Sequence, residues 1–525
     1  MPTLLHPGVY VSEVPSGARS IEGAPTSTAV FVGETERGPL EATKIKSRAD
    51  YERYFGGYFR ERDAASPPDG PTRVLTAYAI DGFYANGGTS AYVLRAMDDG
   101  EDGVIATAVR GPIEASSPGL WGKSVSVLFL APSGGSGFRI AVVYDSPEPN
   151  RERRLVEVWD RLSTDPADEN YVVDRLRGSL YIRWSDEAPV AAPALDEVGS
   201  PPSSSPDEDD IVEFAVKLDD GAGGGGVLVA GDYAGILADG LAGVDDAALL
   251  VATCDGLLTN TDYTQIVDQF VGFAEGRPRQ DLFFVGDLPP QRGADPTSAT
   301  GETVEAKEGL TSSNFAGMYW PHLVVSDLVG EGRNPTITLP PSGYVAGLFA
   351  RIDARRGVWK APAGTEATLN ATIAIEHQLN DLHSDDLNPA GVNALRQIPG
   401  SGRVVWGART MVPASEWRYV PVRRTAIFLR TSIYNGIQWA VFEPNDEGLW
   451  GSLRTSIGGF METQFRNGAF AGRTSDEGYF VKVDADTTTE IDQAAGIVNI
   501  LVGFAPLRPA EFVVVKLSQK TQSAA

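Results

Sequence analysis

The side chains that could bind a metal gather in one short segment. His377 and His383 stand six residues apart, with aspartates beside them at 381, 385 and 386. Imidazole and carboxylate are common ligands of divalent metals. Two ligands on one helical turn need a spacing of three or four residues, which this pair lacks. The pattern therefore favours a solvated helix end over a metal site, and we predict no metal or other cofactor.

A glycine run offers a second possible chemistry. GAGGGG at 221–226 fits the spacing of a dinucleotide-binding fingerprint through Gly221, Gly223 and Gly226. The residues that follow, VLVAGDY, do not open a helix, although the phosphate-binding turn requires one. Four adjacent glycines also fit almost any glycine template by chance. We interpret the run as a flexible linker.

Acid pairs and nucleophiles give no better case for catalysis. Glu443 and Glu447 flank a Pro-Asn-Asp turn, where acids at a helix start are stabilised by the helix dipole without any substrate. Of the four histidines, His6 lies in a terminal arm and His322, in WPHLVVSD, is typical of a strand edge. Neither a G-x-S-x-G turn nor a serine, histidine and acid triad stands out. We predict that the chain is not an enzyme.

The elements that surround these residues alternate between strand and helix patterns. Apolar runs typical of buried strands are TAVFVG at 28–33, AYVLRA at 91–96, the end of DDAALLVAT at 245–253, and QDLFFVGD at 280–287. Helical spacing of apolar residues indicates helices at 73–86, 261–274 and 343–354, the last with Ser342 and Gly357 as caps. Alternating strands and helices predict an α/β core.

A longer helix is predicted near the C-terminal end. Asn445 can cap it, its apolar residues recur at helical spacing from Leu449 to Phe465, and it should end at Asn467-Gly468. One face of this helix must therefore be buried.

Residues 103 to 219 carry a different pattern. Short strand candidates at 124–130, 138–144, 154–159 and 211–218 predict a separate β domain. Within it, residues 187–210 are rich in proline, serine and acids and offer little apolar surface to pack. We interpret them as a mobile surface loop.

Length and charge narrow the range of partners. A chain of 525 residues is long enough for about three domains. Its 44 basic and 70 acidic residues give a net charge of -26, which repels nucleic acid. Cys254 is the single cysteine, so no internal disulfide can form.

The sequence also indicates where the protein is made. The first residues resemble no secretory signal, and no apolar run approaches the roughly 20 residues that span a bilayer. We expect assembly in the cytosol without membrane insertion, and exit within a particle or by lysis.

Each end of the chain holds a lone strand pattern. PGVYVSEVPSG at 7–17 alternates Val9 and Val11 with Tyr10 and Ser12, and EFVVVKL at 511–517 follows two prolines. Neither has an obvious hairpin partner nearby. Such a strand either completes a sheet of its own domain or is donated to a neighbouring subunit. The pattern alone leaves both alternatives open.

Several long segments resemble the contractile tail sheath family, found in myovirus tails, contractile bacteriocins and bacterial contractile injection systems. They include PGVYVSEVPSGARSIEGAPTSTAVFVG at 7–33, SPGLWGKSVSV at 117–127, PHLVVSDL, LPPSGYVAGLFARIDARRGVWKAP at 339–362, LNPAGVNALRQIPGSGRVVWGART at 387–410, EWRYVPVRRTAIFLRTSI at 416–433, QWAVFEPNDEGLW at 438–450 and FAPLRPAEFVVVKLSQ at 504–519. The resemblance covers about 1–100 and 235–525, whereas 130–230 matches only in general character.

The resemblance implies a structural subunit that forms stacked hexameric rings around an inner tube and contracts from a metastable extended state. Its partners would be further copies of itself, the inner tube protein, and baseplate and terminator or cap proteins. The terminal arms would join neighbouring subunits, and the helix at 446–467 would face the tube. The residues implied are Val9, Tyr10, Val11, Phe512, Val513, Val514 and Val515 in the arms, and Asp446, Glu447, Arg454 and Glu462 on the helix.

The expected fold is a multidomain α+β and α/β chain, with an α/β sheath core, an inserted outward-facing β-rich domain and extended terminal β arms. The predicted parts are a linker arm at 1–25, core segments at 26–102 and 231–400 with subtilisin-like but non-catalytic topology, the inserted domain at 103–230, a C-terminal domain at 401–505 and an arm strand at 506–525. A non-contractile structural or binding protein is the alternative interpretation, and an enzyme is a more distant one.

Overall fold

The computed structural model describes residues 19–60, 72–97, 108–149, 151–186, 190–198, 206–219, 228–254 and 260–512. The chain forms two compact units. We call Pro25–Arg424 the core unit, and Met1–Ala24 together with Thr425–Ala525 the C-terminal unit. Each is considered separately below.

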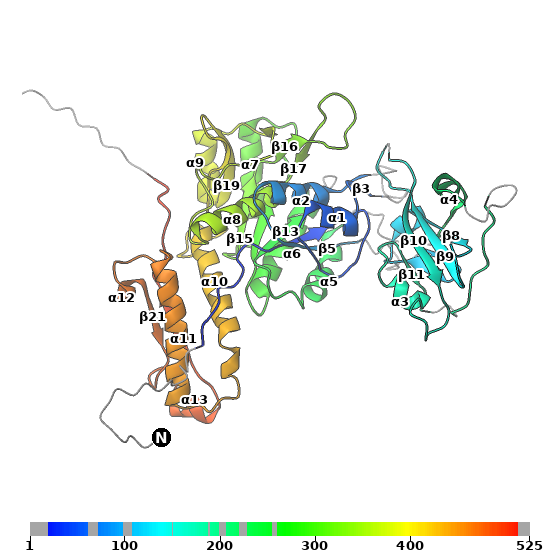
Figure 1. The fold of residues 1–525 in the computed structure, drawn as a ribbon. Coiled ribbons are helices and arrows are strands. Elements are labelled where there is room, and N and C mark those ends of the chain that lie inside the picture. Colours follow the sequence, from blue (N-terminus) through cyan, green and yellow to red (C-terminus); the bar gives the residue numbers. More distant parts are fainter. Residues whose placement is uncertain are drawn as a thin grey trace, which may run out of the picture. The chain divides into compact units, whose positions relative to one another are not determined.

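The core unit is organised around an eight-stranded sheet with the order β2-β5-β1-β13-β14-β15-β19-β20 (Figure 1). The strands are β1 (Ala29–Gly33), β2 (Thr43–Ile45), β5 (Ala91–Arg95), β13 (Leu249–Thr253), β14 (Phe283–Asp287), β15 (Ala316–Trp320), β19 (Val392–Ile398) and β20 (Gly402–Val405). The six inner strands run parallel, while β2 and β20 pair antiparallel at the two edges. Four of the inner strands, β1, β13, β14 and β15, are buried at every residue, as parallel strands covered on both faces require.

Helices cover both faces of this sheet, with α2 and α8 on one side and α5 and α6 on the other (Figure 1). The helices of the core unit around the sheet are α1 (Arg48–Phe55), α2 (Leu75–Ala85), α5 (Ala230–Gly240), α6 (Asn260–Gly276), α7 (Pro296–Glu308), α8 (Ser342–Arg356) and α9 (Asp381–Ala390). The mixed α/β architecture and the strands and helices predicted for the core are therefore confirmed.

Helices α2 and α8 pack closely because glycines line their contact. A Cβ added at Gly347 would lie 2.3 Å from the carbonyl oxygen of Phe83, so only glycine allows this approach. The prediction that Ser342 caps α8 is wrong. Pro341 is the N-cap, and the backbone N–H of Ser342 donates to Asp287 Oδ1 at 2.8 Å. Gly357 is the C-cap, as predicted.

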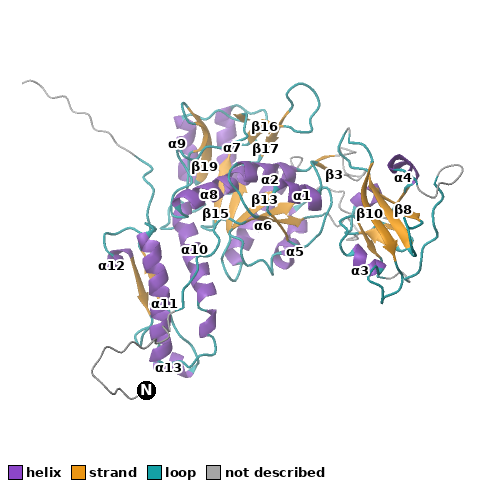
Figure 2. Ribbon diagram, in the orientation of Figure 1, coloured by secondary structure: helices purple, strands orange, loops and turns teal. Residues whose placement is uncertain are grey.

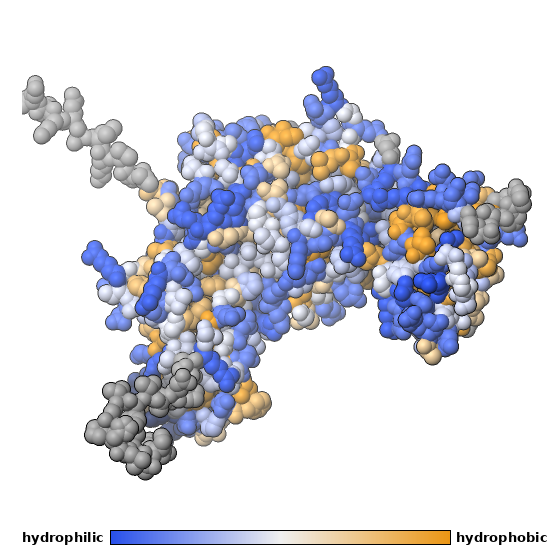
Figure 3. Space-filling model, viewed as in Figure 1, coloured by the Kyte–Doolittle hydropathy of each residue, from blue (hydrophilic) through white to orange (hydrophobic). Residues whose placement is uncertain are grey.

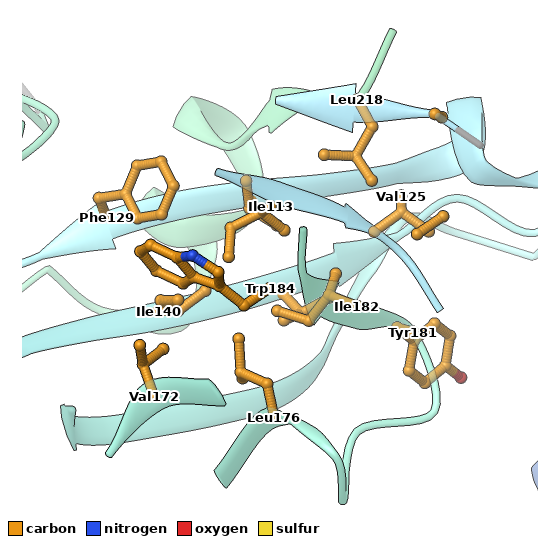
Figure 4. Close-up of a cluster of buried hydrophobic side chains, with 14 of the residues drawn as sticks. Ile113, Val125, Phe129, Ile140, Val172, Leu176, Tyr181, Ile182, Trp184 and Leu218 are labelled. Carbon is orange, nitrogen blue, oxygen red and sulfur yellow. The ribbon is translucent and has the colours of Figure 1, made fainter. Parts of the chain in front are cut away.

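A second group of strands lies between β5 and β13 in the sequence. It forms a four-stranded sheet, β10-β9-β8-β12, and a three-stranded sheet, β11-β7-β6. The elements are β6 (Val109–Arg110), β7 (Ile113–Ala115), η1 (Leu120–Ser124), β8 (Val125–Leu130), β9 (Phe138–Tyr144), β10 (Arg154–Leu162), α3 (Val172–Leu176), β11 (Ile182–Trp184), α4 (Glu208–Phe214) and β12 (Val216–Lys217). Figure 4 shows side chains from both sheets, including Phe129 and Trp184, converging in one apolar core.

Two expectations for this region are wrong. The strand predicted at 211–218 forms only at 216–217, in β12, whereas 211–214 belong to the helix α4, because Asp207 accepts from the backbone N–H of Asp210 as an N-cap and acids fill the first turn. The segment predicted as a mobile loop also contains fixed residues. Asp196 accepts from Arg110 at 2.8 Å and from the backbone N–H of Phe129 at 2.8 Å, and Val198 is buried. The glycine run at 221–226 lies outside the described residues.

A buried polar contact ties this second group to the loop after β1. Glu36 accepts from the hydroxyl of Tyr144 at 2.7 Å, and Arg37 donates to the hydroxyl of Tyr181 at 3.0 Å. Charged groups are costly to bury unless they are bonded in this way. The contact therefore fixes both glutamate and arginine where the two groups of strands meet.

The remaining strands of the core unit form small sheets at its periphery. They are β3 (Phe59–Arg60) with β4 (Thr72–Arg73), and β16 (Leu323–Ser326) between β17 (Thr336–Leu339) and β18 (Ala374–Ile375).

In its described residues, the C-terminal unit consists of helices and one two-stranded sheet (Figure 2). Helix α10 (Val420–Gly436) enters it from the core unit; the other elements are η2 (Gln438–Ala440), α11 (Glu447–Arg466), α12 (Ser475–Gly478), β21 (Tyr479–Lys482), α13 (Glu490–Ala494) and β22 (Leu501–Phe504). Leu449, Trp450 and Leu453 of α11 are buried together with Val483. The long helix and its buried face are thus confirmed. Within the described ranges, no helix is long and apolar enough to cross a bilayer.

Candidate assembly interface

The histidines that suggested a metal site are structural. His377 contacts the carbonyl oxygen of Gln291 through Nε2 at 3.1 Å and stacks on Trp320, with 5.4 Å between ring centres. His383 lies in the capping box of α9, where its backbone N–H donates to Asn380. Both histidines are buried, so the predicted solvated helix end is wrong for them, whereas Asp381, Asp385 and Asp386 are exposed on α9 as predicted. Among the described residues, no group of three or more histidine, cysteine or acidic side chains could hold a metal ion.

His322 is also buried, before the central strand β16, and does not lie at an exposed strand edge. Its Nε2 contacts the carbonyl oxygen of Leu288 at 3.1 Å. Burial lowers the pKa of this imidazole to about 4, so the ring is neutral at physiological pH. This is the environment of a packed core histidine and not of a catalytic base.

Asp287, which the sequence reasoning did not single out, is a buried acid. It ends β14 beneath the first turn of α8, and burial raises its pKa to about 8. A raised pKa is often a sign of catalysis. Here the carboxyl is enclosed and accepts from the backbone of Ser342, so its role is to hold the start of α8. Its position at the carboxyl end of a buried parallel strand was the available signal in the sequence.

Asp446 and Glu447 lie at the start of α11. Asp446, and not Asn445 as predicted, is the N-cap, and it accepts from the backbone N–H of Leu449 at 2.9 Å. Asn445 instead accepts from the indole N–H of Trp450 at 2.8 Å and donates to the carbonyl oxygen of Ile497 at 3.1 Å. Glu447 occupies the exposed first turn. A capping role accounts for these charges without a substrate.

The other two charges proposed for the tube-facing helix also have local partners. Arg454 donates to the carbonyl oxygen of Val483 at 3.3 Å. Glu462 accepts from Arg466 at 2.8 Å and from the hydroxyl of Tyr479 at 3.1 Å. Arg454 and Glu462 are therefore held in place by residues in and next to β21 and by the helix itself.

The most unusual feature of the C-terminal unit is its sheet. Strands β21 and β22 pair antiparallel with each other and, within the described residues, with no further strand. Helix α11 packs against β21, yet Phe480 and Leu501 remain 49% and 52% exposed. A two-stranded sheet is marginally stable alone, and its outer edges present unpaired N–H and C=O groups. Both outer edges of this sheet are therefore without a strand partner among the described residues.

The predicted arm residues are almost all beyond what the structure describes. Val9, Tyr10 and Val11 of the first arm, and Val513, Val514 and Val515 of the last, lie outside the described residues. Phe512 is the last described residue and is largely exposed. The sequence reasoning missed the acceptor sheet, although YFVK at 479–482 and LVGF at 501–504 are both short strand patterns.

Two family models match this chain, one in the core unit and one mainly in the C-terminal unit. The model of the phage tail sheath protein central domain matches residues 232–411, and that of the phage tail sheath C-terminal domain matches 413–520. Together they cover more than half of the chain. The chain belongs to the contractile tail sheath family. The first match includes most of the parallel sheet, and the second includes α11, β21 and β22.

Relatives in this family support the assignment over shorter segments. The tail sheath protein of Burkholderia phage BcepMu is 30% identical over 175 residues, which are 31% of this chain and 35% of that protein. A putative prophage major tail sheath protein of Pseudomonas aeruginosa is 28% identical over 223 residues, 41% of this chain and 54% of the relative. The matches span only 35% and 54% of the length of these two curated relatives.

Solved sheath structures share the fold over nearly the whole chain. A chain of the anti-feeding prophage baseplate matches with a TM-score of 0.56 and 22% identity, covering 99% of this chain and 100% of that one. The sheath complex of an extracellular contractile injection system in the contracted state gives a TM-score of 0.56, 22% identity and 99% coverage of both chains. A sheath tail protein from Listeria innocua gives 0.56 at 12% identity, covering 93% and 96%. At these sequence identities, the structural similarity shows a shared fold and no more.

Proposed function

We propose that this chain is the sheath subunit of a contractile, phage-tail-like particle. It polymerises as stacked hexameric rings around an inner tube and contracts from a metastable extended state to drive the tube through a target envelope. The observation that carries this proposal is the open two-stranded sheet β21–β22 in a chain of the sheath family. The proposed role is structural and involves no catalysis.

The terminal arms would complete that sheet in neighbouring subunits. The strand patterns around Val9–Val11 and 512–515 are apolar and lack a partner nearby in the sequence. Added strands would satisfy the free edges of β21 and β22 and cover Phe480 and Leu501. Each subunit would remain linked to others while the folded units change their positions, which is the requirement for a polymer that contracts without falling apart.

The exposed apolar side chains support assembly through the C-terminal unit. Of 20 exposed large hydrophobic residues in the described chain, nine lie after Thr425 although this part is much the shorter one. They are Tyr434, Val441, Phe442, Phe480, Ile491, Ile497, Leu501, Leu507 and Phe512. Figure 3 shows apolar surface at the end of this unit near α13. Such a concentration is typical of surfaces that a partner covers.

Contraction requires only a modest energy difference for each subunit. Two packings of rigid subunits that differ by a few kcal/mol per subunit give a large total over a polymer that switches cooperatively. The particle would assemble in the bacterial cytoplasm, with baseplate and terminator or cap proteins at the ends of the sheath. An inserted, outward-facing β-rich domain and a non-catalytic core of subtilisin-like topology belong to the same proposal.

Removing the first arm tests the assembly mechanism. We expect purified full-length protein to form hollow tubes in negative-stain electron microscopy, and a variant lacking residues 1–17 to remain as discrete particles. A milder test replaces Val9 and Val11 with aspartate, which should also prevent tube formation. Ser12→Asp serves as the control, because an extended strand would place Ser12 on the opposite face from the two valines.

Normal contractile sheaths from the deleted variant would contradict the arm mechanism. Discrete particles from both proteins, even with the cognate inner tube added, would favour a non-contractile structural or binding protein.

Charge reversal on α11 tests the tube-facing assignment. Glu447→Lys should weaken co-sedimentation with inner tubes, whereas Glu208→Lys should not. Both residues are exposed acids in the first turn of a helix, so both substitutions carry the same helix-dipole cost of about 0.3–1 kcal/mol. Equal tube binding by the two variants would count against a tube-facing α11 and against roles for Asp446, Arg454 and Glu462 there.

A further inference from the structure

Residues Arg19–Ala24, which we call the N-terminal strap, lie along α10 and α11 of the C-terminal unit (Figure 1). The backbone N–H of Arg19 donates to the hydroxyl of Ser456 in α11 at 3.0 Å. At the other end of the strap, the backbone N–H of Ala24 donates to the hydroxyl of Ser432 in α10 at 2.8 Å. The strap is therefore held at both ends by helices more than 400 residues away in the sequence.

Side-chain packing fixes the strap between these two bonds. Ile21 is buried, and a Cβ added at Gly436 would lie 2.7 Å from both of its γ carbons. A Cβ at Gly23 would lie 3.2 Å from the ring of Phe428. The guanidinium of Arg19 stands over the ring of Trp439 at 5.0 Å, a favourable cation–π geometry. Glycine at 436 is what makes room for Ile21.

We propose that the strap is an intrachain anchor: it stays on its own α10 and α11 in the sheath and fixes the point from which the N-terminal arm reaches a neighbouring subunit. This inference rests on the proposed function, because it assigns a role to the arm. Gly436, Ser432, Ser456 and Trp439 are its positioning residues. The arm then comprises the residues before Arg19, and not the whole linker arm predicted at 1–25.

The anchor limits the reach of the arm. An extended chain spans at most about 3.3–3.6 Å per residue, so the eight residues from Arg19 to Val11 cover about 30 Å. Release of the strap would add roughly 20 Å for its six residues. The acceptor edge on the neighbouring subunit must therefore stay within about 30 Å of Arg19 in both the extended and the contracted sheath.

A disulfide across the anchor tests whether the strap stays on its own chain. We would combine Arg19→Cys and Ser456→Cys with Cys254→Ala, so that only the introduced pair can form a disulfide. The oxidised protein should polymerise and contract like the reduced protein, and should run as a monomer on a non-reducing denaturing gel. A ladder of covalently linked subunits would show that the strap is exchanged between chains. A block of contraction on oxidation would show that it must leave its groove. Either result would overturn the proposal.

Proteolysis of the unassembled subunit tests the anchor independently of polymerisation. Arg19 and Ser20 are exposed, but the backbone N–H of Arg19 is bonded to Ser456 and Ile21 is buried, so the Arg19–Ser20 bond cannot enter a protease site until the strap is released, and trypsin should cleave there slowly. Gly436→Ala should raise the cleavage rate at least about tenfold, because proteolysis follows the population of the open state. Gly459→Ala adds the same methyl group in α11 with nothing within 4 Å, and should leave the rate unchanged. Equal cleavage in wild type and Gly436→Ala would overturn the anchor even if sheaths form normally, whereas protected straps in a protein that never polymerises would count against the proposed function alone.

Discussion

The strands of the two units differ in how far their residues are buried. In the core unit, β1, β13, β14 and β15 are buried at every position. In the C-terminal unit, no residue of β21 or β22 is fully buried, and Phe480 and Leu501 are about half exposed. Helices of the core unit cover both faces of its main sheet. In the small sheet, by contrast, neither outer edge pairs with another strand among the described residues. The core unit thus buries its strands through its own contacts, and the C-terminal unit is the part for which we propose a role in assembly.

The largest effect on stability is expected in the core unit. Arg424 and Asp353 form an ion pair in which both side chains are nearly inaccessible, at 3% and 4% exposure, with two bonds of 3.0 and 2.6 Å. Asp353→Ala would leave the guanidinium buried without its carboxylate and should reduce the free energy of unfolding by about 3–5 kcal/mol. Chemical denaturation measures this change.

A matched exposed pair provides the control. Glu366 contacts Arg356 at 3.0 Å, but both side chains are more than half exposed. Glu366→Ala should therefore cost no more than about 1 kcal/mol. Similar losses from the two substitutions would contradict the view that the core unit depends on its buried contacts.

A smaller effect that depends on pH is expected at Asp287. The pKa of Asp287 is about 8 in the folded protein, against an ordinary value of 3.8, which we take for the unfolded chain. Between pH 3.8 and pH 8, the folded state therefore binds more protons than the unfolded state. The stability associated with this group is fully present below pH 3.8 and is lost as pH rises to 8. Asp287→Asn should remove that dependence, which amounts to at most about 1.4 kcal/mol per pH unit.

The test is a series of denaturation curves from pH 4 to pH 8. The stability of Asp287→Asn relative to wild type should increase across this range and become constant above it. His322 acts with the opposite sign, because its depressed pKa makes the folded state lose stability as pH falls from 6.5 to 4. Parallel profiles for variant and wild type would show that Asp287 is ionised in the fold.

The smallest effect on stability should accompany a large effect on assembly. Phe480→Ser and Val158→Ser each remove a large apolar side chain that is 49% exposed, the first from β21 and the second from β10. Both should change the free energy of unfolding by about 0.5 kcal/mol or less. Only Phe480→Ser should reduce tube formation in electron microscopy, and an equal reduction by Val158→Ser would remove the distinction between the two sheets.

The same contrast explains what could be predicted from the sequence. Continuous apolar runs such as TAVFVG and QDLFFVGD specify buried parallel strands by composition alone. Helices with a strong apolar face, such as α8 and α11, were equally predictable. The exact caps were not: Asp446 and Asn445 are neighbours with nearly equal capping ability, and only the hydrogen bonds distinguish them.

The candidate interface was harder to predict because it depends on distant pairing. Strands β21 and β22 are separated by 18 residues without a tight hairpin signal, so neither identifies the other. The strap packs against helices more than 400 residues away, a contact that no local pattern can reveal. The strand prediction for 211–218 was wrong at 211–214 for a local reason, because the acids at 207–210 favour the start of a helix.

The most direct test of the account is amide hydrogen exchange on assembled tubes, compared with the unassembled variant that lacks residues 1–17. If arm strands from neighbours complete the small sheet, amides in Tyr479–Lys482 and Leu501–Phe504 should become strongly protected on assembly. Those in Ala29–Gly33 should be equally protected in both samples. Unchanged exchange in β21 and β22 in fully formed tubes would contradict assembly by strand addition at this sheet.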